Sequence, residues 1–347
     1  MIVPSIQKAL LLKSKFGEFS VDERPVPRPG PEQILVKIKS AGLNPVDWKV
    51  QKYGVFVDKF PAVIGSDIAG DIVAVGPGVK QWAEGDKVFL QGIYRDGSNY
   101  AAFQQFVIGK CSLTAKIPEN ISYDEAAVIP VGIACSFIGL YHEHPHGLGI
   151  THPKKGGQGK YTGIPFLVLG GSTSVGQLVI QLAKFSGFSP IITTASPKHN
   201  GLLKSLGATD IIDRNIPLSS LPDEINKITD MPIKLVFDTV SIADTQKAGF
   251  RVLAPGGKIA VNQQPAIEST EDKDVIFVMG VPNLPHNVEF LKDLYNVLTE
   301  WLREGIVKPN KVDILPGGLS GIIHGLERLE NGQVSAEKLV ARPQETI

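Results

Sequence analysis

The sequence predicts an α/β protein in which a doubly wound parallel sheet interrupts a β-rich domain. Three observations support this prediction. The first third of the chain alternates apolar and polar residues with a period of two, the middle alternates short strands with helical segments, and residues 166–184 read as strand, small-residue turn and helix. At 347 residues the chain is long enough for two domains with separate cores.

The first part, to about Ala126, is predicted to be β-rich. Residues 34–39, 71–76 and 86–90 have the alternation of half-buried strands, and Gly and Pro turns separate them. A helix is expected to begin at Asp124, and helical character continues from 131 to 141.

The middle of the chain predicts a parallel sheet covered on both faces, because strands and helices alternate there. The expected strands are 166–169, 191–194, 210–212, 235–238, 258–261 and 275–279. After Gly280 come a helix over 287–304 and an apolar tail at 338–343, too little for a domain of their own. We therefore expect domain segments at 1–126, 127–283 and 284–347, the last returning to the first domain.

The segment 166–176, FLVLGGSTSVG, predicts a dinucleotide site. An apolar strand ends at Gly170-Gly171, and a helix follows over 177–184. Helix amides and the positive end of the helix dipole can there face a pyrophosphate, and glycine lets the backbone approach it. Thr173 departs from G-x-G-x-x-G, since it stands where a glycine is usual. A glycine turn before a helix also occurs in α/β proteins that bind nothing.

The next strand favours NADP(H) over NAD(H). It ends at Ala195-Ser196, where NAD-binding folds place an Asp or Glu on the ribose hydroxyls, and Pro197, Lys198 and His199 follow. A carboxylate would repel a ribose phosphate, whereas a hydroxyl beside a cation accepts it. The alternative is an ordinary solvated lysine after a strand.

Composition narrows the class of protein. Lys and Arg balance Asp and Glu at 35 each, so no charge excess points to nucleic acid or an anionic membrane. No apolar stretch of roughly 18 residues and no signal-like start stand out, so we expect a cytoplasmic protein. Two cysteines, Cys111 and Cys135, cannot form a thiolate zinc site or a disulfide framework. The His-rich segment 142–160 is interpreted as a surface insertion rather than a metal site.

Motifs in both halves resemble one known family. They are AGLNPVDWK at 41–49, PAVIGSDIAG at 61–70, VAVGPG at 73–78 and GDKV at 85–88, then IPVGI at 129–133, LGGST at 169–173, ASPK at 195–198 and EKLV at 337–340. Over nearly its whole length the chain resembles the zinc-independent branch of the medium-chain dehydrogenase/reductases, and within it fungal trans-acting enoyl reductases and ToxD-like proteins. This resemblance implies a GroES-like β domain interrupted by a Rossmann domain.

The resemblance also implies chemistry without a metal. Zinc-dependent members carry a Cys near position 44 and a His after position 65, where this chain has Asn44 and Ser66. A zinc alcohol dehydrogenase needs three protein ligands and an open position, which these residues do not supply. The implied reaction is hydride transfer from NADPH to the C=C of an α,β-unsaturated carbonyl, either an enoyl or a quinone-like substrate.

Three residues are catalytic candidates by the same resemblance. Lys49 would face the coenzyme ribose or the substrate carbonyl, with a surface lysine as the alternative. Tyr53 lies near a position where relatives carry a proton-donating Tyr, although its spacing from Asn44 is two residues shorter, and a tyrosine of the core or lining the cleft is an equal alternative. Cys135 stands where relatives have a Thr, and a buried inert thiol is its ordinary state.

The remaining implied residues would bind the coenzyme. They are Val46, Asp47, Trp48 and Lys49 beside the nicotinamide; Ser172, Thr173, Ser174 and Val175 at the pyrophosphate; Ser196, Pro197, Lys198 and His199 at the adenosine phosphate; Arg214 at the adenine; Val261, Asn262, Phe277, Val278, Met279 and Gly280 towards the nicotinamide; and Leu339 and Val340 closing the cleft.

The prediction is therefore an NADPH-dependent reductase of a small-molecule α,β-unsaturated carbonyl, which is either free or tethered to a carrier. Relatives imply a monomer or a homodimer. The alternative of a different class is an NADPH-binding accessory protein without turnover. Neither nucleic acid nor a membrane is expected as a partner.

Overall fold

In the computed structural model, which describes residues 3–347, the chain forms two units that are interleaved in sequence. Unit 1 comprises residues 3–131, 281–304 and 309–347, and unit 2 comprises 132–280 and 305–308. The chain thus leaves unit 1 to build unit 2 and then returns to unit 1.

Unit 2 contains a six-stranded sheet in which every pair is parallel. The strand order is β11 (Asp210–Asp213), β10 (Ile191–Ala195), β9 (Phe166–Leu169), β12 (Leu235–Asp238), β13 (Gly257–Val261) and β14 (Lys273–Phe277). Numbered within the unit this is 3-2-1-4-5-6, the order of the dinucleotide-binding doubly wound fold. The predicted fold class is confirmed.

The helices of unit 2 follow its strands. They are α4 (Ser174–Ser186), α5 (Asn200–Leu206), α6 (Leu221–Asn226) and α7 (Ala243–Val252), together with α3 (Pro130–Tyr141) from residue 132 on. Helix α4 packs against β9 and β10, and α7 packs against β12 and β13. All four residues of β9 are buried, as expected for a central parallel strand.

One strand differs from the prediction. The expected strand 275–279 is shifted, because β14 is Lys273–Phe277 and its ladder with β13 ends at the pair Val261 and Phe277. Val278 is still buried, so the apolar run continues after the hydrogen-bonded strand has ended. Val278, Met279 and Gly280 therefore belong to the loop at the carboxyl edge of the sheet.

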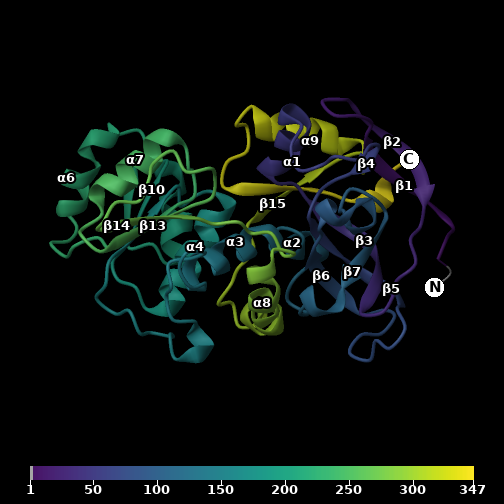
Figure 1. Ribbon diagram of the computed structural model, residues 1–347, viewed down its shortest axis with the longest axis horizontal. Helices are drawn as coiled ribbons and strands as arrows, with labels where there is room; N and C mark the ends of the chain where they lie inside the picture. Colours follow the sequence, from purple (N-terminus) through teal and green to yellow (C-terminus); the bar gives the residue numbers. More distant parts are fainter. Residues whose placement is uncertain (1–2) are drawn as a thin grey trace. The chain divides into compact units, whose positions relative to one another are not determined.

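Unit 1 is built on a seven-stranded sheet. Its path is β15 (Lys311–Leu315), β16 (Glu337–Ala341), β3 (Gln33–Gly42), β5 (Asp67–Val75), β6 (Lys87–Gln91) and β8 (Thr114–Lys116), with β7 (Phe106–Lys110) paired to β3. A second sheet has the order β2 (Phe19–Pro25), β1 (Ile6–Leu12) and β4 (Ala62–Val63). Figure 1 shows β15, in yellow, near the purple and blue strands from the start of the chain.

The helices of unit 1 are α1 (Pro45–Tyr53), α2 (Tyr123–Ala126), α8 (Pro285–Arg303) and α9 (Gly321–Glu330). Helix α8 agrees closely with the predicted helix 287–304. Its buried residues, among them Leu291, Leu294, Leu298 and Trp301, recur at helical spacing and form its packed face. Helix α1 packs against α9, so the returning segment supports the early helix.

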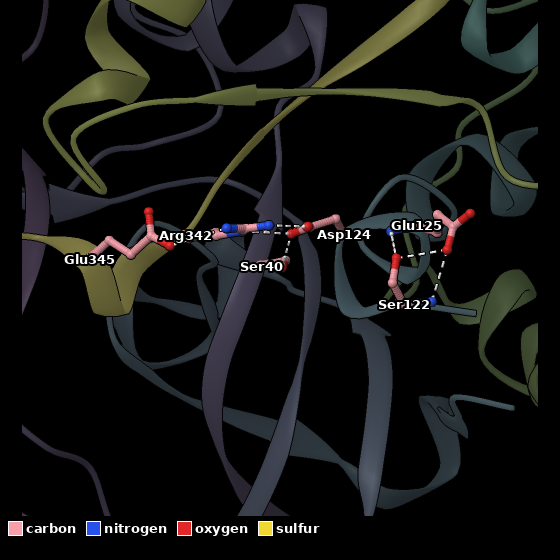
Figure 2. Close-up of polar contacts among 6 residues, drawn as sticks. All are labelled: Ser40, Ser122, Asp124, Glu125, Arg342 and Glu345. Carbon is pink, nitrogen blue, oxygen red and sulfur yellow. Dashed lines mark hydrogen bonds and ion pairs between the residues drawn. The ribbon is translucent and has the colours of Figure 1, made fainter. Parts of the chain in front are cut away.

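Charged side chains fasten the end of the chain to unit 1, as Figure 2 shows. Arg342, just after β16, donates to Asp124 of α2 over 2.7 Å, and Ser40 of β3 donates to the same carboxylate over 2.5 Å. Burial opposes ionisation of Asp124, but the hydrogen bonds from Arg342 and Ser40 hold its pKa below the usual value. This half-buried pair joins three segments that are distant in sequence.

The expectation that no apolar stretch approaches membrane-spanning length needs a correction. Residues 123–141, which include α2 and α3, form one helical stretch that is long and apolar enough, by length and composition alone, to span a membrane. Of the apolar window within it, 72% is buried inside the protein, which is typical of a core helix.

Candidate functional site

Three glycines shape the turn between β9 and α4. Gly170 has φ +83°, and a Cβ there would lie 2.4 Å from a methyl of Val240. A Cβ on Gly171 would lie 2.2 Å from the Thr193 hydroxyl, and one on Gly176 would lie 2.3 Å from the Gly170 carbonyl oxygen. All three distances are far below van der Waals contact, so the turn requires glycine at each position.

Thr173 explains the departure from the usual glycine pattern. It has φ −67°, which needs no glycine, and it is the N-cap of α4. Its Oγ1 accepts from the Gly176 amide over 2.9 Å and donates to Thr239 Oγ1 over 2.9 Å. Thr173 thus fixes the start of α4 with its side chain and links β9 to β12. Ser174 and Val175 form the first turn of the helix, where the dipole favours an anion.

A pocket of about 330 Å³ opens at this turn. It lies in unit 2, at the carboxyl ends of β9, β10, β11 and β12. Its lining residues are Leu169, Gly170, Ser172, Thr173, Thr194, Ala195, Asp213, Arg214, Asn215, Ile216, Leu218, Leu221, Val240 and Thr245. Ser172, Thr173 and Arg214 were predicted at this site, and the structure brings them together. The pocket lies where the strand order of the sheet reverses, and doubly wound folds bind their ligands at this point.

Basic residues follow the end of β10, whose last residue, Ala195, lines this pocket together with Arg214. Ser196 begins the short turn η5 (Pro197–His199), which carries Lys198 and His199. The pKa of His199 is lowered by partial burial and by the positive charges of Lys198 and Arg214. The end of β10 offers Ala195 and Ser196 rather than a carboxylate, which is chemistry suited to a phosphate.

A second group of predicted residues lies at the ends of β13 and β14. A Cβ on Gly280 would lie 2.4 Å from Cys135 Sγ, so this thiol of α3 packs directly on the loop after β14. Val261 and Val278 are buried and Phe277 packs against the core, so these three form packing rather than an open surface.

Asn262 has an unmatched acceptor. Its backbone amide donates to Ser241 Oγ over 2.8 Å, in the loop after the adjacent strand β12. Its side-chain Oδ1 is buried and has no hydrogen-bond partner among residues 3–347. Buried polar atoms are nearly always paired in native structures, so this oxygen can accept a hydrogen bond from a water or from a ligand.

In unit 1 the predicted Asp47 belongs to a buried charged cluster. Its carboxylate accepts from the Asn44 amide over 2.7 Å and so holds the start of α1. Asn44 Nδ2 in turn donates to Asp67 over 3.0 Å, and the Lys338 ammonium forms an ion pair with the same carboxylate. The other Asp67 oxygen accepts from the Val131 amide over 2.7 Å. Asp67 thereby connects α1, α3 and β16.

Asp47 is completely buried and one of its oxygens has no partner in the described part of the chain. Burial, together with the nearby negative charge of Asp67, raises its pKa to about 7; the Asn44 amide and Lys338 oppose this only partly. The ion pair of Lys338 is with Asp67, and its positive charge offsets only part of the effect of burial on Asp47.

Helix α1 carries Trp48, Lys49 and Tyr53. The Lys49 ammonium lies 5.6 Å from the Trp48 ring, and the Tyr53 ring lies 5.8 Å from it. Lys49 is half-buried, and burial lowers its pKa. Tyr53 is 55% exposed, which places it at the surface of unit 1. Val46 packs against the core.

Leu339 and Val340 are fully buried in β16. Val340 pairs with Gly42, and the Leu339 carbonyl accepts from the Leu43 amide over 2.9 Å. Their observed contacts support the segment before α1.

Residues that the sequence reasoning did not single out are Asp67, Lys338, Thr194, Asp213, Val240 and Thr245. Asp67 and Lys338 stood inside quoted motifs, and a charged residue within an apolar strand was the available signal.

Two family models match the chain: the alcohol dehydrogenase GroES-like domain over residues 30–144 and the zinc-binding dehydrogenase model over 174–285. Trans-enoyl reductase FSL5 of Gibberella zeae is 32% identical, covering 97% of each chain. Trans-enoyl reductase TOXD of Cochliobolus carbonum is 37% identical over 69% of this chain and 77% of its own. A mycobacterial protein solved in complex with NADPH superposes with TM-score 0.77 at 20% identity, covering 97% of this chain and 100% of that one.

The chain belongs to the medium-chain dehydrogenase/reductase family, with fungal trans-enoyl reductases and ToxD among its relatives. It is an oxidoreductase built on a nicotinamide-dinucleotide fold. Within residues 3–347 no three His, Cys, Asp or Glu side chains are grouped as metal ligands.

Proposed function

We propose that this protein is an NADPH-dependent reductase that reduces the C=C of an α,β-unsaturated carbonyl without a metal. The observation that carries the proposal is the pocket at the β9–α4 turn, which Arg214 lines, together with the end of β10, where Ser196 and Lys198 follow and no carboxylate stands. The names of its relatives, trans-enoyl reductases, support the same reaction class.

The pocket fits such a coenzyme. The Thr173-capped turn and the α4 dipole would hold the pyrophosphate, and the apolar part of the pocket would hold the adenosine. Ser196, Lys198 and Arg214 would bind the ribose phosphate. The Asn262 oxygen would accept from an amide donor such as a carboxamide NH₂. When bound, NADPH supplies the hydride.

The other residues would orient and stabilise. Lys49 would place a positive charge near the substrate oxygen and favour enolate character. Cys135 lies against Gly280, and its thiol is a weak donor, so it shapes the site rather than donating strongly. Tyr53, at the surface, remains a candidate for contact with substrate.

The donor set supports chemistry without zinc. At the two positions where zinc-dependent relatives carry ligands, Asn44 uses its Nδ2 to donate to Asp67 and Ser66 is a buried hydroxyl. Asp67, the carboxylate that accepts from Asn44 Nδ2, already forms an ion pair with the Lys338 ammonium. An amide that donates its hydrogen and a neutral hydroxyl therefore stand at the two positions where zinc ligands would be needed.

Stopped-flow measurement of bound NADPH tests the proposal. Mixing with a panel of enones and enoyl thioesters should oxidise NADPH, seen as loss of absorbance, in protein that metal analysis shows to hold no zinc. Tight NADPH binding without turnover on any substrate would favour the accessory-protein alternative. Stoichiometric zinc would contradict the metal-free mechanism.

A carrier-tethered substrate and a free one can be compared in the same assay. Equal rates with a free thioester and with the same acyl group on a carrier protein would favour the free form. We propose a cytoplasmic location, and the 72% burial of the apolar window within residues 123–141 supports a core helix rather than a membrane span.

A further inference from the structure

The coenzyme pocket contains one carboxylate among its lining residues, Asp213. Asp213 ends β11 and pairs in register with Ala195 of β10. It is partly buried, and its Oδ1 accepts from the Asn215 amide over 2.9 Å. No ion pair links it to Arg214 in the described residues, so most of its acceptor capacity is available.

The neighbours of Asp213 fit a flat aromatic base. Ile216, Leu218, Leu221 and Val240 line the same pocket and supply apolar surface. Apolar walls hold a purine by its faces without distinguishing one purine from another, and a polar group at the edge is needed to discriminate.

A carboxylate is an unexpected group for a pocket that is to hold a polyanion. It repels phosphates, so its presence requires a compensating interaction. Ionised carboxylates only accept hydrogen bonds, and adenine offers an exocyclic amine as donor. A 6-oxopurine presents a carbonyl oxygen at the same position, so this oxygen and the carboxylate would face each other as two acceptors, and the neighbouring donor of the base, N1–H, lies one ring position away.

We propose that Asp213 accepts a hydrogen bond from the exocyclic amine of the coenzyme's adenine and makes the pocket select adenine over a 6-oxopurine. This inference rests on the proposed function, because it assigns a base-specificity residue within the proposed NADPH site. It assigns to Asp213 the discrimination between purine bases, which neither the β9–α4 turn nor the basic residues Lys198 and Arg214 would provide.

The test compares two ligands with two variants by equilibrium binding. NADPH and its hypoxanthine analogue, deamino-NADPH, are titrated calorimetrically against wild-type protein and Asp213→Asn. Charged hydrogen bonds predict that wild-type protein prefers NADPH by about 10- to 100-fold. In Asp213→Asn the preference should fall to within about threefold, with deamino-NADPH gaining affinity because an amide NH₂ can donate to its oxygen.

A matched control is Asp210→Asn, at the other end of β11, where the carboxylate contacts Thr209 and does not line the pocket. It should keep the wild-type preference. Equal, tight binding of both ligands to wild-type protein, or an unchanged preference in Asp213→Asn, would overturn the inference and leave the proposed function standing. Failure of wild-type protein to bind NADPH at all would overturn both. Thermal melting of each variant identifies any that is unfolded.

Discussion

Replacing Asp47 with Asn should remove a large part of the pH dependence of stability in unit 1. Asp47 is fully buried, and its pKa is raised to about 7 by burial and by the charge of Asp67. In the unfolded chain an aspartate has a pKa near 3.8. Between these two values the native state holds a proton that the unfolded state has lost, so stability falls as pH rises through this window.

The size of the effect follows from the shift. About three pKa units at about 1.4 kcal/mol each predict a loss of roughly 4 kcal/mol between pH 4 and pH 8. Asparagine keeps an acceptor for the Asn44 amide and never ionises. The free energy of unfolding of Asp47→Asn should therefore exceed that of wild-type protein increasingly as pH rises from 4 to 7, and the difference should be constant above that.

Urea denaturation at a series of pH values measures this difference. Exposed Asp58 provides a control, since Asp58→Asn should follow the wild-type pH profile. Parallel profiles for wild-type protein and Asp47→Asn between pH 4 and 7 would show that the buried carboxylate stays ionised in the native state. The description of the cluster given above would then be wrong.

Three further substitutions test other contacts. Thr173→Ala removes the N-cap of α4 and should cost about 1 kcal/mol of stability in urea denaturation, with weaker coenzyme binding by calorimetry. Lys338→Met leaves the buried Asp67 carboxylate without its ammonium and should cost about 3–5 kcal/mol; an unchanged melting temperature would show that the pair is not a stabilising one. Gly280→Ala should cost about 1–3 kcal/mol through its contact with Cys135, and the added substitution Cys135→Ala should recover most of it.

The sequence predicted most of unit 2 because each signal was local. Strands β9 and β12 match their predicted ranges, since their apolar runs stop at polar or glycine residues. Strand β14 was misplaced because an apolar run gives no sign of where the hydrogen-bonded ladder stops. The sequence alone did not explain why Thr173 stands where a glycine is usual. The structure explains it, because the Thr173 hydroxyl caps α4.

Contacts between distant segments could not be read from the sequence. Asp67 and Lys338 are 271 positions apart, and only the fold shows that β16 lies near α1 and β5. Asp213 was not identified, since a carboxylate at a strand end is ordinary until the pocket around it is known. The fully buried Leu339 and Val340 likewise depended on three-dimensional packing.

Tracing the hydride tests the central claim most directly. NADPH carrying deuterium at C4 of the nicotinamide, in each stereochemical form, is incubated with the protein and an enone that turns over, and the product is examined by mass spectrometry and NMR. One of the two forms should deliver deuterium to the β carbon of a saturated carbonyl product. Deuterium on the carbonyl carbon of an alcohol product, or in no product at all, would contradict C=C reduction.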